Sequence, residues 1–316
     1  MFSWIPESAS NLASNVDNIT LFVTIISVFF LVLITAILVY FSVKYRRKSE
    51  DQETAYITGN ETIEIIWTII PTILLMVIFV WAYIGFRELR NPPPEALEIN
   101  VVAKQWLWQF DYFDGKKAIN ELTVKQNQPV RLIMRSDDVL HSFFVPQFRV
   151  KQDILPGNYT QLWFTPTKVG TYDLFCTEYC GAGHSNMLAK VHVLSPEAYT
   201  RWEKGEELGV PGGLAATTSI PPSELGEKLY TQRGCNACHS INGADGVGPT
   251  FKGLFGMTEN LQDGSTVEVD ENYLRESIYE PQAKMVTGYA PVMPAFKGIL
   301  KDDEVTALIE YIKTVK

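Results

Sequence analysis

Residues 176–187 read Cys-Thr-Glu-Tyr-Cys-Gly-Ala-Gly-His-Ser-Asn-Met, and this stretch decides how the rest of the chain is interpreted. Its two cysteines, Cys176 and Cys180, are followed by His184 and Met187 at intervals of four and three residues. Thiolate, imidazole and thioether groups at this spacing are ligands for a soft metal, and together they favour copper over magnesium or calcium. A second imidazole is needed from elsewhere, and His141 in an upstream Val-Leu-His-Ser sequence supplies it.

The number of cysteines separates three kinds of metal site. One cysteine, two histidines and a weakly bound methionine would describe a mononuclear blue-copper site. Two thiolates can each bridge a pair of metals, and such a binuclear copper centre suits electron transfer because its geometry changes little on oxidation. A tetrahedral zinc site with two cysteines and two histidines is the structural alternative, which Met187 and Glu178 disfavour. His192 lies outside the stretch and is interpreted as an ordinary strand histidine.

Composition narrows the class of protein. The 316 residues suggest two or more domains. A formal net charge of −9 argues against nucleic-acid binding and is compatible with docking a basic protein. The four cysteines form two close pairs, and three of the four histidines are assigned to the same two sites. Such pairs can be disulfides, zinc ligands or cofactor attachments, and the accompanying histidines favour two cofactor sites.

Two apolar segments near the N-terminus predict a membrane anchor. Residues 19–43 contain no charge and are long enough to cross a hydrocarbon core of ~30 Å. A secretory signal peptide is the alternative, but the run is too long and lacks a small-residue cleavage site. A second run, residues 65–86, returns the chain and completes a two-helix hairpin over residues 1–90. The basic cluster at residues 44–48 is expected to stay in the cytoplasm, which places the rest of the chain outside it.

Residues 95–195 show the period of short alternating strands, separated by turn signals such as Asp114-Gly and Pro156-Gly. Strands of this number and length predict a β-sandwich or barrel. The clearest of them are residues 97–102, 130–134, 159–164, 170–175 and 189–194. His141 and the stretch 176–187 then fall on loops, where functional residues are commonly found on such a scaffold.

The C-terminal part carries the second cofactor motif. Residues 196–222 are rich in proline and glycine and predict a linker. Cys235-Asn-Ala-Cys238-His239 is the attachment sequence for a c-type haem. A redox-active or zinc-binding dithiol is the alternative for this pentapeptide taken alone. The sixth iron ligand should be a methionine, and the candidates are Met257, Met285 and Met293.

Residues 15–195 resemble subunit II of cytochrome c oxidase, whose copper centre is called CuA. The resemblance rests on the pattern at 176–187, the Val-Leu-His-Ser loop at 139–142 and an aromatic segment at 105–112. It implies a cupredoxin-like β-sandwich or barrel over residues 95–195 that holds two coppers. In that family the residues at positions Cys176 and Cys180 bridge the coppers. The remaining ligands would be His141, His184, Met187 and the backbone carbonyl of Glu178.

Three further roles are implied by the same resemblance. The Glu178 side chain would reach a magnesium ion at the interface with the catalytic subunit, a cation that carboxylates suit. Trp106 would receive electrons from cytochrome c, whereas the simpler interpretation is a packed aromatic of the sandwich. Glu64 opens the second membrane segment and would lie near the mouth of a proton channel. Its simpler interpretation is a solvated acid favoured by the helix dipole.

Residues 223–316 resemble a small class I cytochrome c. Met293 has the Met-Pro-x-Phe setting of that family's axial loop, and Pro249 matches the proline whose carbonyl orients the axial histidine. The resemblance implies an all-α domain with one covalent haem c on Cys235 and Cys238 and with His239 and Met293 as iron ligands. Met285 remains the second choice. A cytochrome c fused to subunit II is a known bacterial variant of the oxidase.

The whole chain therefore resembles the electron-accepting subunit of a haem-copper terminal oxidase. This implies electron flow from cytochrome c or a quinol:cytochrome c reductase-type complex through haem c and CuA to haem in subunit I, for O2 reduction coupled to proton pumping. The expected surroundings are the bacterial inner (cytoplasmic) membrane, oxidase subunits I and III, and periplasmic copper and haem domains.

The principal alternative is the CuA subunit of a nitric oxide reductase. A quinol oxidase subunit would lack the copper ligands, and a nitrous oxide reductase would need a further large domain. The haem motif argues against a membrane copper carrier or sensor.

Overall fold

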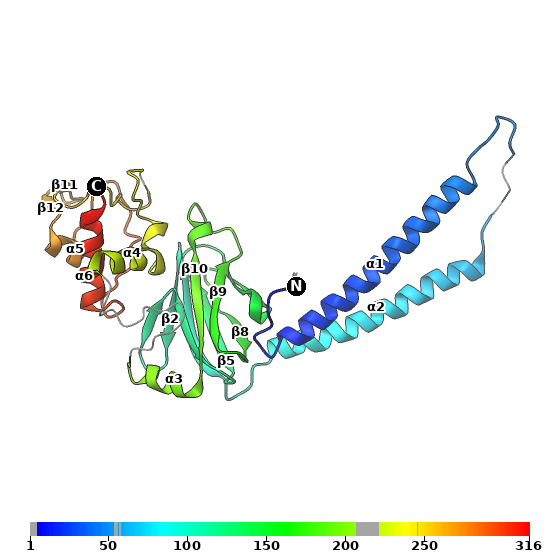
Figure 1. Ribbon diagram of the computed structural model, residues 1–316, viewed down its shortest axis with the longest axis horizontal. Coiled ribbons are helices and arrows are strands. Elements are labelled where there is room, and N and C mark those ends of the chain that lie inside the picture. The colour runs from blue at the N-terminus through cyan, green and yellow to red at the C-terminus, as the bar shows by residue number, and fades with distance from the viewer. Residues whose placement is uncertain (1–4, 54–55, 57, 207–220, 245) are drawn as a thin grey trace. The chain divides into compact units, whose positions relative to one another are not determined.

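The computed structural model describes residues 5–53, 56, 58–206, 221–244 and 246–316 (Figure 1). These residues form two compact units. One comprises Leu12–Asn91, and the other comprises Pro92–Lys316 together with the N-terminal residues up to Asn11. Each unit is described by itself below.

Leu12–Asn91 forms a hairpin of two long helices, α1 (Ala13–Lys44) and α2 (Glu61–Arg90). Both are long and apolar enough to cross a membrane. They run antiparallel (Figure 1), and the Trp81 indole N–H donates a 2.9 Å hydrogen bond to Asn15 Oδ1 across the pair. Both helices extend beyond the predicted spans 19–43 and 65–86, because hydropathy marks the apolar middle of a helix and not its polar ends. Asn60 caps α2 by accepting a hydrogen bond from Ile63 N–H.

The second unit begins with a sandwich of two five-stranded sheets. The first sheet has the order β3-β2-β1-β5-β8 and the second the order β4-β10-β9-β6-β7. Neighbouring strands are antiparallel except in the pairs β1–β5 and β4–β10. The strands are β1 (Leu97–Lys104), β2 (Leu107–Tyr112), β3 (Lys117–Ile119), β4 (Glu121–Lys125), β5 (Val130–Ser136), β6 (His141–Val145), β7 (Val150–Ile154), β8 (Thr160–Phe164), β9 (Gly170–Cys176) and β10 (Leu188–Leu194).

Buried and exposed side chains alternate along the strands, and the buried ones form the core of the sandwich. In β5, for example, every second residue from Val130 to Ser136 is buried, as expected for a strand with one face inward. The largest fully buried side chains are aromatic: Trp108, Phe110, Phe143, Phe148 and Phe164. Residues 9–11, which the sequence analysis grouped with the hairpin, are tied to this sandwich by backbone hydrogen bonds from Ala9 N–H to Gln147 and from Asn11 N–H to Thr165.

A short helix, α3 (Pro196–Glu203), follows the last strand at the start of the predicted linker 196–222. Ser195 caps it by accepting a hydrogen bond from Ala198 N–H, and Trp202 packs on Tyr112 with ring centroids 5.1 Å apart. The rest of the predicted linker falls largely on residues 207–220, which lie outside the described residues.

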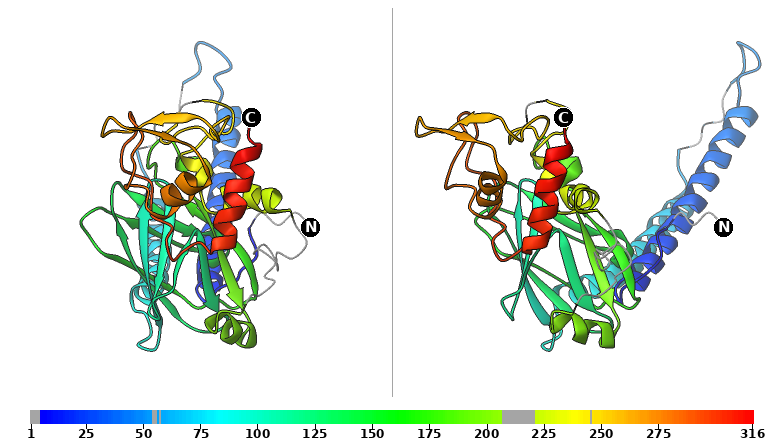
Figure 2. Two further views of the ribbon diagram at one scale, coloured as in Figure 1. Left: turned by 90° about the vertical axis from the view of Figure 1, so that its left-hand side faces the viewer. Right: turned by 60° about the vertical axis from the view of Figure 1, so that its left-hand side comes forward.

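The C-terminal domain contains α4 (Pro222–Gln232), α5 (Glu271–Tyr279) and α6 (Asp302–Thr314). A small antiparallel pair, β11 (Thr258–Asn260) and β12 (Thr266–Glu268), adds a feature that the all-α expectation did not include. Helices α4 and α6 lie against each other (Figure 2). Gly226 makes this close approach possible, because a Cβ there would lie 2.0 Å from the carbonyl oxygen of Ala307.

Candidate copper and haem sites

Two loops at one end of the second sheet bring the six predicted copper ligands together. His141 begins β6, and the other five lie at the end of β9 and in the loop that leads to β10. The two sulfur atoms of Cys176 and Cys180 are 3.8 Å apart. The remaining ligand atoms divide between the sulfurs: His141 Nδ1 (3.9 Å) and Glu178 O (3.4 Å) lie by Cys176, while His184 Nδ1 (3.4 Å) and Met187 Sδ (3.8 Å) lie by Cys180.

The chemistry of this cluster fits copper. His141, Cys176, Cys180 and Met187 are all buried, and no side-chain carboxylate is among the clustered ligand atoms. Soft sulfur and imidazole donors of this kind select copper over hard cations. Burial and the neighbouring Cys176 raise the pKa of the Cys180 thiol to about 12. Two adjacent thiolates are therefore unfavourable without a cation, and a bound metal ion reverses that preference.

Asp138 is a residue of this site that the sequence analysis missed. Its Oδ1 accepts a 2.7 Å hydrogen bond from Nε2 of His141, which leaves Nδ1 facing the Cys176 sulfur. Backbone N–H groups of Gln105 and Val139 donate to the same carboxylate at 2.6 Å each and fix its position. Partners of this kind orient a ligating imidazole and raise its basicity. The only sequence signal was an acid three residues before a histidine in a loop.

Removing the Asp138 carboxylate is expected to weaken copper binding. Asp138→Ala should lower copper affinity by about 10–100-fold, the usual effect of losing a partner of a metal-bound histidine. Competition with a copper chelator measures this. Asp137→Ala is the matched control, because Asp137 pairs with Lys104 and Arg135 and not with His141. Equal affinities for the two variants would show that Asp138 does not position the ligand.

Trp106 lies directly on the ligand loop. Its indole N–H donates a 3.2 Å hydrogen bond to the carbonyl of Cys180, and the Gln105 side chain donates a second one at 2.6 Å. The ring packs so closely that a Cβ at Gly183 would lie 2.4 Å from it. Trp106 is 6% exposed, so it combines a packed aromatic with contact to the copper cluster.

The backbone carbonyl and the side chain of Glu178 have different surroundings. Its carbonyl faces the Cys176 sulfur, whereas its side chain points away and pairs with Lys151 at 3.1 Å. Lys151 also pairs with Asp153 at 2.7 Å. Glu64 belongs to the helical hairpin, where it is exposed in the first turn of α2.

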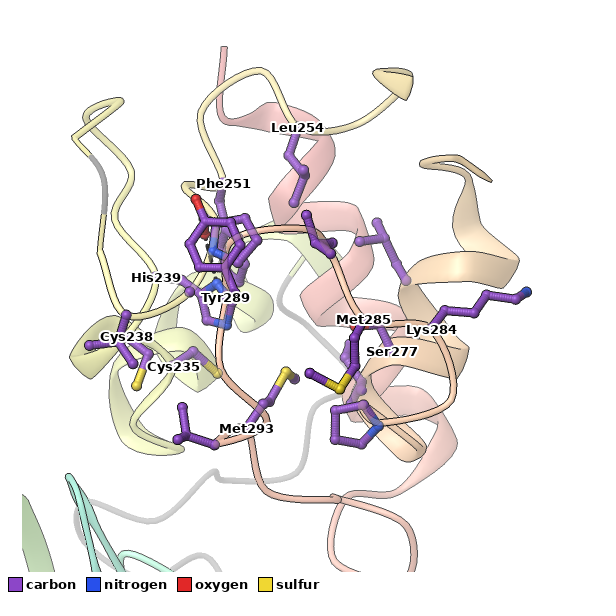
Figure 3. Close-up of a pocket in the computed structure, with 18 of the residues that line it drawn as sticks. Cys235, Cys238, His239, Phe251, Leu254, Ser277, Lys284, Met285, Tyr289 and Met293 are labelled. Atoms are coloured by element: carbon purple, nitrogen blue, oxygen red, sulfur yellow. Dashed lines mark hydrogen bonds between the residues drawn. The ribbon is translucent and has the colours of Figure 1, made fainter. Parts of the chain in front are cut away.

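A large apolar cavity in the C-terminal domain is bordered by Cys235, Cys238 and His239 (Figure 3). Its empty volume is about 1190 Å³, counting its opening to solvent. His239 Nδ1–H donates a 2.7 Å hydrogen bond to the carbonyl of Pro249, which leaves Nε2 available to bind a metal. Phe251 stacks on the imidazole at 4.6 Å between ring centroids. Two thiols beside an apolar cavity and an oriented imidazole fit a covalently attached haem.

Two of the three candidate methionines reach this cavity. Met285 and Met293 both line it, from the chain between α5 and α6 (Figure 3). Met257 is 49% exposed and does not line it. Met293 also packs against the buried apolar cluster of the domain. The structure thus reduces the choice to two, and Met293 stays the prediction.

A membrane hairpin, a sandwich with a soft-metal cluster and a domain with a haem-attachment motif define a membrane-bound electron-transfer subunit. Three family models match the chain: cytochrome c oxidase subunit II, transmembrane domain (residues 2–84), cytochrome c oxidase subunit II, periplasmic domain (residues 116–194), and cytochrome c (residues 223–316). The chain belongs to the cytochrome c oxidase subunit 2 family, as its curated relatives also show.

Cytochrome c oxidase subunit 2 of Alkalihalophilus pseudofirmus is 31% identical over 315 residues, covering 95% of this chain and 86% of the relative. The Bacillus subtilis protein of the same name is 26% identical, covering 98% of this chain and 91% of the relative. The crystal structure of the periplasmic domain of subunit II from Bradyrhizobium japonicum is 28% identical, with a TM-score of 0.35, and covers 36% of this chain and 96% of that chain.

Several predictions from the sequence are thereby confirmed. The chain is a subunit of a haem-copper oxidase, which is an oxidoreductase complex, and it carries a cytochrome c domain. It is a membrane protein. Its fold class is a helical hairpin, a cupredoxin-like sandwich and a helical cytochrome c domain. The family implies CuA copper in the sandwich, and the cytochrome c domain implies haem c.

Proposed function

We propose that electrons from cytochrome c or a quinol:cytochrome c reductase-type complex enter this chain at haem c, pass to a binuclear CuA centre and continue to haem in subunit I. There O2 would be reduced to water with coupled proton pumping. The observation that carries this proposal is the meeting of His141 with the soft donors of residues 176–187 in one buried cluster.

The sandwich would hold two coppers, which when bound supply a one-electron carrier. Cys176 and Cys180 would hold them, with His141 and the Glu178 carbonyl beside one sulfur and His184 and Met187 beside the other. The ligand loop is closed by its own ends, since Cys176 N–H donates to the carbonyl of Met187 and β9 pairs with β10 beyond it. A loop fixed in this way keeps the ligands in place in either oxidation state, which favours rapid electron transfer.

The C-terminal cavity would hold one haem c, which when bound supplies a second one-electron carrier. Cys235 and Cys238 would attach it, and His239 and Met293 would bind its iron. The Pro249 carbonyl holds the His239 ring in one orientation, and the Tyr230 hydroxyl fixes the backbone by donating to the carbonyl of His239 at 2.5 Å. The apolar lining would keep water from much of a bound haem, a condition that influences its potential.

Three further residues would serve magnesium binding, electron transfer and proton transfer. The outward carboxylate of Glu178 would bind magnesium together with subunit I, Trp106 would pass electrons to the copper centre, and Glu64 would lie at the mouth of a proton path. The rate at which the copper centre is reduced in Trp106→Phe, measured by rapid mixing, tests the role of Trp106. The rate of proton uptake in Glu64→Gln tests the role of Glu64.

The proposed surroundings are a bacterial inner (cytoplasmic) membrane with oxidase subunits I and III. The basic residues 44–48 after α1 favour a cytoplasmic loop and therefore copper and haem domains on the periplasmic side. Protease protection in intact spheroplasts tests this orientation, since cleavage at residues 44–60 from outside would contradict it.

Metal analysis of the purified complex tests the proposed function. We expect this chain to contribute two coppers and one covalent haem, counted apart from the copper and haem of the catalytic subunit, with magnesium present as a further ion. Zinc without a near-infrared copper absorption would overturn the copper assignment. The large subunit that co-purifies decides the class, because a subunit that reduces nitric oxide and not O2 would favour the nitric oxide reductase alternative.

A further inference from the structure

Arg233 lies two residues before Cys235 and is held between carboxylates from two different domains. Its Nη1 is 3.1 Å from Glu121 Oε2, and its Nη2 is 2.8 Å from Glu304 Oε1. Glu121 begins β4 of the sandwich, whereas Glu304 lies in the first turn of α6. The three side chains are 12%, 23% and 11% exposed, so this cluster is largely removed from water.

Apolar and backbone contacts surround the same ion pairs. Leu107 and Ile119 of the sandwich belong to the buried cluster formed by the haem domain's helices. Gly234 lies against Asn120, where a Cβ would be 2.7 Å from the Asn120 side-chain nitrogen. The φ angle of Gly234 is +77°, which also favours glycine. The contact therefore has an apolar part beside a charged one.

Burial decides how much the ion pairs matter. Exposed ion pairs contribute little to stability, but a buried charge that loses its partner is strongly unfavourable. The Nε atom of Arg233 has no hydrogen-bond partner among the described residues. The ion pairs with Glu121 and Glu304 compensate the charge of the guanidinium group. Separating the domains would leave Arg233 with Glu304 alone.

We infer that the haem domain is docked on the sandwich at residues 119–121, and is not merely tethered to it. The ion pairs of Arg233 stabilise this contact. Residues 119–121 are linked to the copper cluster by contacts through Trp108. Asn120 Oδ1 accepts a 2.9 Å hydrogen bond from Trp108 N–H, and the Trp108 ring meets the His141 ring edge-on at 6.4 Å. The inference concerns the resting contact between the domains and stands apart from the proposed electron path.

Hydrogen–deuterium exchange on the purified, fully loaded complex tests the docking. Glu121→Gln changes only the sandwich, yet we expect amides of residues 230–236 in the haem domain to exchange about tenfold faster. Glu98→Gln is the matched control, because Glu98 pairs with Arg131 inside the sandwich and should leave residues 230–236 unchanged. Unchanged exchange at 230–236 in folded Glu121→Gln would overturn the inference.

A second variant covers the case in which Glu121→Gln unfolds the sandwich, which faster exchange throughout β5 would reveal. Arg233→Gln then tests the contact by a change in the haem domain, and the haem spectrum shows whether that domain is still folded. We expect faster exchange at residues 119–123, and protection equal to the unmodified protein there would overturn the docking.

Discussion

Replacing Cys176 by serine should remove the copper centre and leave the haem in place. Cys176 provides one of the two sulfurs around which the other donors gather, and a serine hydroxyl is a poor ligand for copper. Electron transfer to O2 should fall by more than about 100-fold, beyond the effect of losing an outer partner of a metal ligand. Copper content, near-infrared absorption and the haem spectrum are the measurements.

His192→Gln is the control for this variant. His192 is a buried histidine of β10 whose Nδ1 lies 3.1 Å from the Thr171 hydroxyl, and it is not part of the clustered ligands. Its replacement should leave the copper content unchanged. A Cys176→Ser protein that retains the full near-infrared absorption would refute the copper-binding role assigned to this sulfur.

Met293→Leu should lower the midpoint potential of the haem, whereas Met285→Leu should leave it nearly unchanged. Loss of a thioether ligand destabilises the reduced iron, and we expect a shift on the order of 0.1 V or more, within the ~0.8 V over which axial ligands set haem potentials. Redox titration of the haem absorption measures the shift in both variants. The two methionines line the same cavity, so each is the matched control of the other.

The reverse result, a large shift for Met285→Leu alone, would move the axial ligand to Met285. Equal small shifts in both variants would show that neither thioether binds the iron. In either case the Cys235 and Cys238 attachment can be checked separately, because covalent haem remains with the chain on denaturation.

Local patterns predicted most of the architecture. The apolar runs located both membrane helices, and the period of two located strands such as β5 and β10 within one or two residues. The spacing of residues 176–187 predicted a ligand loop, because a loop this short keeps its side chains near one another. His141 could be added only because the donor set was incomplete without it.

The side-chain partners of individual residues were not predictable from such patterns, whether near or distant in sequence. Asp138 became part of the copper site through the orientation of the His141 ring. Arg233 looked like an ordinary basic residue before a haem motif, and its pairing with Glu121 spans 112 positions of sequence. The first contact depends on side-chain orientation and the second on how folded domains meet, and neither periodicity nor spacing reports these.

Gly226 has a consequence for the order in which the protein is made. It lets α4, the first helix of the haem domain, pack against α6, which is the last helix of the chain. The domain therefore cannot close its core until residues 302–314 of α6 have been synthesised. Throughout that interval the motif at residues 235–239 is already synthesised but not yet enclosed. The proposed attachment site would thus be open to haem before α6 folds onto α4.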